Sequence, residues 1–108
     1  ELALGRPDRL AVDVGPVIDA DARARIEAHV EAMRARGRRI HVLQARHAGP
    51  LPAGHFVSPT LIEIEQLSEL DREVFGPVLH VLRYRREALD DLVMQINATG
   101  YGLTLGVH

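Results

Sequence analysis

The segment Arg72-Glu73-Val74-Phe75-Gly76-Pro77 combines residue types that could hold a sugar. One carboxylate can accept hydrogen bonds from both adjacent hydroxyls of a ribose, and Glu73 offers such a group. Phe75 offers a flat apolar face against which a ribose and an attached ring can rest. Gly76 permits a close backbone approach, and Pro77 favours an extended conformation at the residue before it. Taken alone, however, so short a pattern more often marks a solvated loop acid beside a core aromatic.

Two missing residue types limit the chemistry of the chain. Its 108 residues include no cysteine, which excludes a disulfide, a thiolate metal site and a thiol nucleophile within them. All 13 basic residues counted as Lys or Arg are arginines, so Schiff-base chemistry and a phosphate-binding lysine are excluded as well. We interpret the arginine, alanine and glycine richness as codon bias of a GC-rich genome rather than as a functional choice.

Three other groups of polar residues favour ordinary structural roles. The spacing of His41, His47 and His55 gives no compact ligand pattern, so we expect surface histidines and no metal site. The acids Asp90 and Asp91 lie near the start of an expected helix, where they favour its dipole. Two arginine clusters lack the interleaved aromatic residues of a nucleic-acid surface and are expected to be solvated or to contact other protein; they are Arg34, Arg36, Arg38 and Arg39, and Arg83, Arg85 and Arg86.

Composition indicates a soluble globular segment of about one small domain. The hydrophobic fraction is 46% and the formal net charge is −2, so we expect neither nucleic acid nor membrane to bind through this segment. No apolar run has membrane-spanning length, and Glu1 opens directly into an amphipathic stretch without a signal peptide. These features favour a cytoplasmic location.

The first half of the chain predicts a loop and one clear helix. Turn-forming glycines, prolines and aspartates predict a loop over residues 5–16. Asp19 is placed as the N-cap of a helix from Ala20 to Arg36, which Gly37 ends. Along this helix one apolar stripe is expected, formed by Ile26, Val30 and Met33.

Strands and helices then alternate, which predicts an α/β fold with at least some parallel strands. Strand Val78–Tyr84 is so apolar that both of its faces are expected to be covered. The expected elements are strand Arg39–Leu43, loop Gln44–Gly54, strand Phe56–Ile64, a turn or short helix over Glu65–Arg72, strand Val78–Tyr84, helix Arg86–Asn97 and a strand over Leu103–Val107.

The glutamate–apolar–phenylalanine–glycine–proline order of residues 73–77 resembles the signature of aldehyde dehydrogenases. The landmarks around it match that superfamily in the same order: Gly15-Pro16 before a helix, Gly37 after it, residues 54–60 leading into a strand, and residues 97–103. Within the superfamily, residues 13–20, 74–84 and 95–108 resemble the Δ1-pyrroline-5-carboxylate dehydrogenase module of proline utilization A proteins. The resemblance covers essentially the whole chain.

This resemblance implies a fold and an activity. The fold would be part of an aldehyde dehydrogenase catalytic domain, with helices packed on a mostly parallel sheet and residues 1–108 as one internal fragment. The activity would be NAD-dependent oxidation of L-glutamate γ-semialdehyde to L-glutamate in proline breakdown. Glu73 would hold the nicotinamide ribose and Phe75 would support it. For Asn97, Thr99 and Tyr101, which also match the family, we favour structural roles at a helix end.

The family's catalytic cysteine, its activating glutamate and its dinucleotide-binding units lie upstream of this segment, and its substrate-anchoring loop lies downstream. The isolated chain is therefore expected to be inactive and to form one wall of the nicotinamide site. A bifunctional parent would carry an FAD-dependent proline dehydrogenase module as well, and it could form a homo-oligomer. The alternative is a free-standing, non-catalytic α/β module used for binding or subunit contact.

Overall fold

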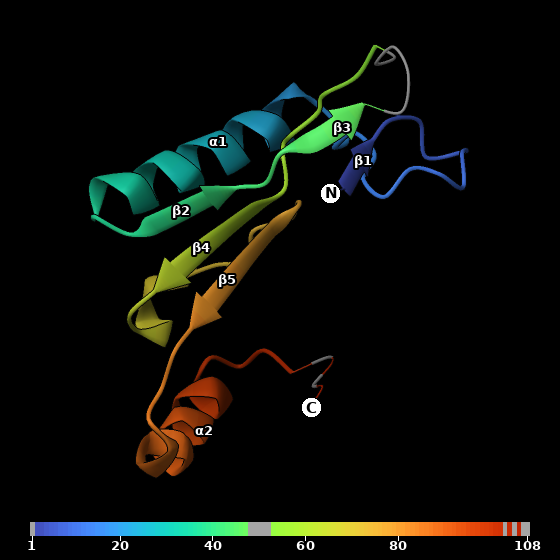
Figure 1. Ribbon diagram of the computed structural model, residues 1–108. Coiled ribbons are helices and arrows are strands. Elements are labelled where there is room, and N and C mark those ends of the chain that lie inside the picture. Colours follow the sequence, from blue (N-terminus) through green and yellow to red (C-terminus); the bar gives the residue numbers. More distant parts are fainter. Residues whose placement is uncertain (1, 48–52, 103, 105, 107–108) are drawn as a thin grey trace.

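The computed structural model describes residues 2–47, 53–102, 104 and 106. Figure 1 shows the longer helix beside the strands and the helix nearer the C-terminus set apart from them. In chain order, the elements are β1 (Leu2–Leu4), α1 (Ala20–Ala35), β2 (Arg39–Val42), β3 (Ala45–His47), β4 (Thr60–Ile64), the 3-10 turn η1 (Leu67–Glu69), β5 (Val78–Leu82), the 3-10 turn η2 (Arg86–Ala88) and α2 (Leu89–Ala98).

Helix α1 forms where the sequence predicts it and for the expected reasons. The Asp19 carboxylate accepts a hydrogen bond of 2.6 Å from the backbone N–H of Ala22, so it caps the first turn. Gly37 has a φ of +78°, a left-handed conformation that ends the helix at little steric cost. Between these ends, Ile26 and Met33 are buried on one face, which confirms the predicted stripe.

The larger sheet has the strand order β2-β4-β5 and carries the core. Strand β4 lies in the centre, antiparallel to β2 and parallel to β5. Its residues Thr60, Ile62 and Ile64 are buried while the residues between them are half-buried. Ile62 and Ile64 pack with Met33 of α1, so the core lies between this helix and one face of the sheet.

The smaller sheet pairs β1 with β3 in parallel, with Leu2 opposite Ala45. The Asp13 carboxylate supports it by accepting a hydrogen bond of 2.8 Å from the backbone N–H of Ala3. Two of the three strand pairs are therefore parallel, and the predicted α/β class with parallel strands is confirmed.

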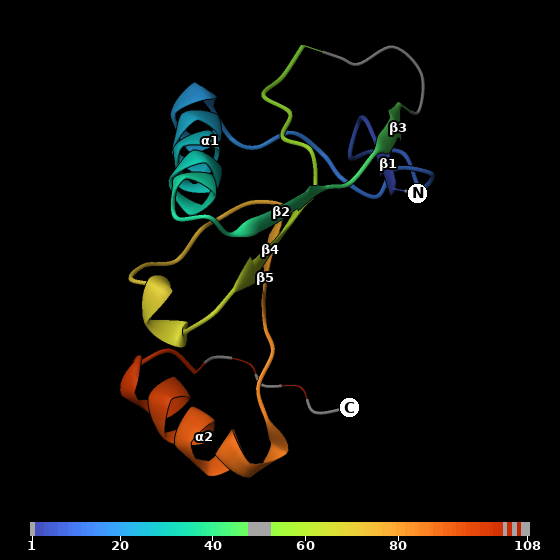
Figure 2. The same cartoon turned by 60° about the vertical axis from the view of Figure 1, so that its left-hand side comes forward.

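Helix α2 lies away from the sheet in both views (Figures 1 and 2). It buries none of its residues. Its apolar side chains are instead open to solvent, and they include Leu89, Val93, Met94 and Ile96. Such a helix lacks, within the described residues, the packing that normally stabilises an amphipathic helix.

Several predicted boundaries were wrong. Strand β4 begins at Thr60 rather than Phe56, and the expected loop Gln44–Gly54 contains β3, whose partner β1 is more than 40 positions away. The second helix becomes α-helical at Leu89 after a 3-10 turn over residues 86–88. Strand β5 stops at Leu82, and Leu79 is 60% exposed, so its second face is not covered as expected. The predicted strand Leu103–Val107 falls on residues that are mostly outside the described part.

Candidate functional site

A groove of about 510 Å³ lies between α1 and the loop that precedes β5. The helix contributes Ala22, Arg25, Ile26 and His29, and the loop contributes residues 72–76. Glu73 and Phe75, the two predicted site residues, therefore line the same hollow. The walls combine apolar side chains with a few charged groups, as ligand sites commonly do.

Both predicted residues present their side chains to solvent. Glu73 is exposed, and Phe75 is 78% exposed. Within the described residues, Phe75 therefore does not pack in the core. A large aromatic side chain exposed beside a carboxylate suits contact with a ligand or with further protein.

Gly76 fixes the distance between the loop and α1. A Cβ atom at this position would lie 2.3 Å from Cδ1 of Ile26, which is one of the most deeply buried side chains described. The φ of Gly76 is +156°, which side chains rarely adopt. The close backbone approach predicted for Gly76 is real, but its partner in this structure is Ile26.

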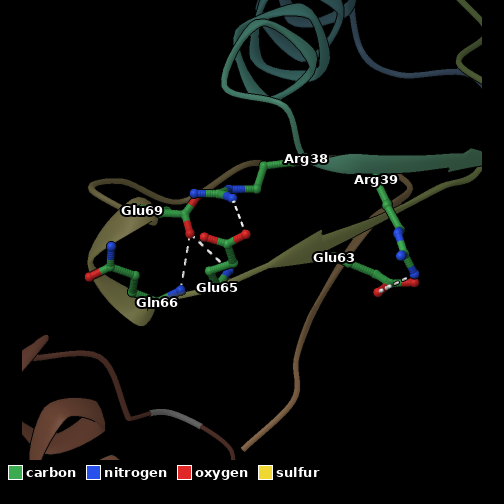
Figure 3. Close-up of polar contacts among 6 residues, drawn as sticks. All are labelled: Arg38, Arg39, Glu63, Glu65, Gln66 and Glu69. Atoms are coloured by element: carbon green, nitrogen blue, oxygen red, sulfur yellow. Dashed lines mark hydrogen bonds and ion pairs between the residues drawn. The ribbon is translucent and has the colours of Figure 1, made fainter.

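The start of the loop is anchored through η1 by ionic contacts (Figure 3). The Arg38 guanidinium lies 2.7 Å from the Glu69 carboxylate and 2.6 Å from that of Glu65. Glu69 also accepts hydrogen bonds from the backbone N–H groups of Glu65 and Gln66. Burial opposes the charge on Glu69, but the bonds from Arg38 and from these two amides outweigh it and lower its pKa.

Two histidines join α1 to β5 beside the groove. The Nε2 atoms of His29 and His80 lie 2.8 Å apart, so one ring donates a hydrogen bond to the other. The rings meet edge to face, with centroids 5.0 Å apart. Burial lowers the pKa of both histidines; Arg72 adds to the effect at His29, and His29 adds to it at His80.

The remaining candidate residues lie outside the groove. Thr99 and Tyr101 line a second hollow, which Arg72 and Glu73 border from the other side. The Thr99 hydroxyl donates a hydrogen bond of 2.7 Å to the carbonyl of Ile96, in keeping with the helix-end role predicted for it. Tyr101 is 61% exposed, and Asn97 is also exposed.

The three histidines whose spacing was compared with a metal site, His41, His47 and His55, lie on separate segments. His41 contacts Glu63 across two strands at 3.0 Å, whereas His55 pairs through its backbone with Val17. The His47 side chain is outside the described part. Among the residues that the structure describes, no group of three or more potential ligands could hold a metal ion. The described helices are also too short or too polar to cross a membrane.

The sequence profile of the Aldehyde dehydrogenase family matches residues 1–108. The chain belongs to this family. Over the whole of this chain, it is 56% identical to the bifunctional protein PutA of Klebsiella aerogenes. Over 94% of this chain, it is 57% identical to the bifunctional protein PutA of Rhizobium meliloti. The chain spans only 8% of the length of each of these relatives. The predicted resemblance to proline utilization A is thereby confirmed.

Solved structures agree with the sequence comparisons. A variant of Bradyrhizobium japonicum proline utilization A superposes with a TM-score of 0.83 at 48% identity, covering all of this chain and 10% of that one. Staphylococcus aureus betaine aldehyde dehydrogenase, solved with NAD+, gives a TM-score of 0.67 at 29% identity. That match covers 84% of this chain and 19% of the other. The aldehyde dehydrogenase fold predicted from the sequence is confirmed.

Sequence reasoning missed the helical wall of the groove and the histidine pair. Arg25 lines the groove because of the way α1 packs against the loop, and the local sequence does not predict that packing. His29 and His80 are separated by 51 positions. The one available signal is that His29 follows the stripe residue Ile26 by three positions, which places both on one helix face.

Proposed function

We propose that this chain is a segment of a longer NAD-dependent aldehyde dehydrogenase that oxidises L-glutamate γ-semialdehyde to L-glutamate in proline breakdown. Its role there is to form one wall of the nicotinamide site. The observation that carries the proposal is that Glu73 and Phe75 line one open groove with both side chains exposed. Similarity over nearly all of this chain to bifunctional PutA proteins, of which it spans 8%, supports a dehydrogenase role in proline utilization for the parent.

The groove suits the ribose of the cofactor. The Glu73 carboxylate has four lone-pair positions and can accept hydrogen bonds from two vicinal hydroxyls at once. Phe75 presents an uncovered ring face beside it, which excludes water from one side of a bound ring. The cofactor, when bound, accepts the hydride that leaves the aldehyde carbon.

The chain's own residues therefore orient the cofactor and do not react. Glu73 fixes the position of the sugar, and Phe75 restricts the tilt of the ring attached to it. The Ile26–Gly76 contact holds the loop at a set distance from α1. A cysteine nucleophile must belong to another segment of the parent protein, because this chain has no cysteine.

The test is NAD+ binding to the full-length protein that contains this chain, measured by calorimetry. Glu73→Gln keeps the size of the side chain but weakens two charge-assisted hydrogen bonds, and we expect the Kd for NAD+ to rise about tenfold. Phe75→Ala removes the ring face and is expected to raise the Kd by a similar factor. NADH formation with L-glutamate γ-semialdehyde as substrate should fall in parallel.

Glu87→Gln is the matched control, because Glu87 is an exposed acid of η2 whose contact with Arg85 is a surface ion pair of 3.7 Å. It should bind NAD+ as the unaltered protein does. Equal Kd values for Glu73→Gln, Glu87→Gln and the unaltered protein would contradict the proposed role of Glu73.

A further inference from the structure

The contact between His29 and His80 joins α1, one wall of the groove, to β5, the strand that follows the loop forming the other wall. His29 lies on α1 and lines the groove, while His80 lies on β5 four residues after Gly76. On α1, Ile26 and His29 are three positions apart and so share one face. Ile26 contacts Gly76 and His29 contacts His80, so two neighbouring contacts set the spacing between the helix and the chain that leaves the loop.

The loop that carries Glu73 lies beside both histidines. Residues 72–74 line the groove together with His29, and they line the second hollow together with His80. The pair therefore adjoins the segment whose position determines where the Glu73 carboxylate points. No other hydrogen bond between side chains of α1 and β5 is found in the described residues.

We propose that the His29–His80 pair is a positioning device that holds the Glu73 loop against α1 when both rings are neutral and releases it when they become protonated. The inference rests on the proposed role of the groove in binding NAD+. One neutral imidazole can donate to another at this distance, but two imidazolium rings have no acceptor between them and repel each other.

The direction of the pH effect follows from the surroundings. Burial keeps the pKa of each ring below its ordinary value, so the unfolded or opened chain takes up protons before the closed one does. The closed arrangement is then fully stable above about pH 6.5 and loses stability as the pH falls below that value. Asp71 opposes this effect at His29, whereas Arg72 and Arg36 reinforce it.

Other charged groups that face the pair do not reverse this direction. They are Arg25 on the same helix as His29, and Glu73 on the loop beside both hollows. Burial remains the largest cause of the lowered pKa at both rings.

The experiment measures the Kd for NAD+ in the full-length protein that contains this chain, at about pH 7.5 and about pH 5.5. In the unaltered protein we expect the Kd to rise about threefold or more at the lower pH, because a smaller fraction of the protein is then in the closed, binding form. In His80→Gln and in His29→Gln, an amide keeps a hydrogen-bonding group but one titrating ring is gone. The ratio of the two Kd values should then approach one.

His41→Gln is the matched control, since His41 is an exposed histidine whose partner is Glu63. It should keep the Kd ratio of the unaltered protein. The Tm of each variant is recorded at the same two pH values to detect a merely structural role. A lower Tm in His80→Gln with an unchanged Kd ratio would overturn the inference, as would an equal change of the ratio in His41→Gln. NAD+ binding absent at both pH values in the unaltered protein would instead refute the proposed function, and this inference with it.

Discussion

Gly76 and Ile26 are packed so closely that no side chain fits between them. An added Cβ at position 76 would lie 2.3 Å from Cδ1 of Ile26, a distance that Cβ contacts in folded proteins do not show. Ile26 is 2% exposed and is held by the helix on which it lies, so it has little room to move away. The glycine of the signature thus sets the separation between the Glu73 loop and α1.

Gly76→Ala is therefore expected to destabilise the parent protein and to weaken its cofactor site. Overpacking of this kind costs about 1–3 kcal/mol, and the loop must shift outward to relieve it. We expect a lower Tm together with a higher Kd for NAD+, measured by thermal unfolding and calorimetry of the full-length protein.

Gly102→Ala is the matched control, because an added Cβ there meets nothing within 4 Å. It should leave the Tm and the Kd for NAD+ close to those of the unaltered protein. If Gly76→Ala and Gly102→Ala proved equally stable, the contact with Ile26 would not be what requires a glycine at position 76.

The sequence predicted best where one local signal determines the structure. Asp19 and the stripe through Ile26 and Met33 defined α1, because a cap and a period of 3.6 residues are properties of neighbouring positions. The signature placed Glu73 and Phe75 together because they are two residues apart on one loop.

What the sequence could not predict depends on contacts between distant segments. Strand β3 exists because Ala45 pairs with Leu2, and residues 44–54 alone are rich in turn formers. Strand β4 begins only at Thr60, where its pairing with Val78 starts. The His29–His80 contact is likewise produced by the packing of α1 on the sheet, and no local pattern signals it.

We expect the contact between Arg38 and Glu69 to stabilise the protein at neutral pH and to lose this effect in acid. The pKa of Glu69 is lowered in the folded chain, so its contribution is present above the ordinary carboxyl value of about 4.3 and is lost as the pH falls through the folded value. Glu69→Gln should therefore lower the Tm of the full-length protein at neutral pH. The difference from the unaltered protein should shrink as the pH falls below about 4.3 and through the lowered pKa of Glu69, because the carboxylate then takes up a proton.

Glu27→Gln provides the comparison, since Glu27 forms an exposed ion pair with Arg23 on α1. Exposed pairs of this type contribute little, so its Tm should change less at neutral pH. Equal losses in Glu69→Gln and Glu27→Gln would show that the anchoring of η1 in Figure 3 is no stronger than an ordinary surface pair.

The 108-residue chain prepared alone is expected to unfold without a sharp transition and to make no NADH. Its α2 buries no residue, and Leu79 leaves one face of β5 open, so the described elements share few buried apolar contacts. Circular dichroism on heating, with and without millimolar NAD+, measures this directly. A broad melt indifferent to NAD+ is the expected result, because in the proposed function Glu73 and Phe75 form only one side of the site. A sharp transition raised by NAD+ would show a self-standing nucleotide-binding module and would favour the non-catalytic alternative.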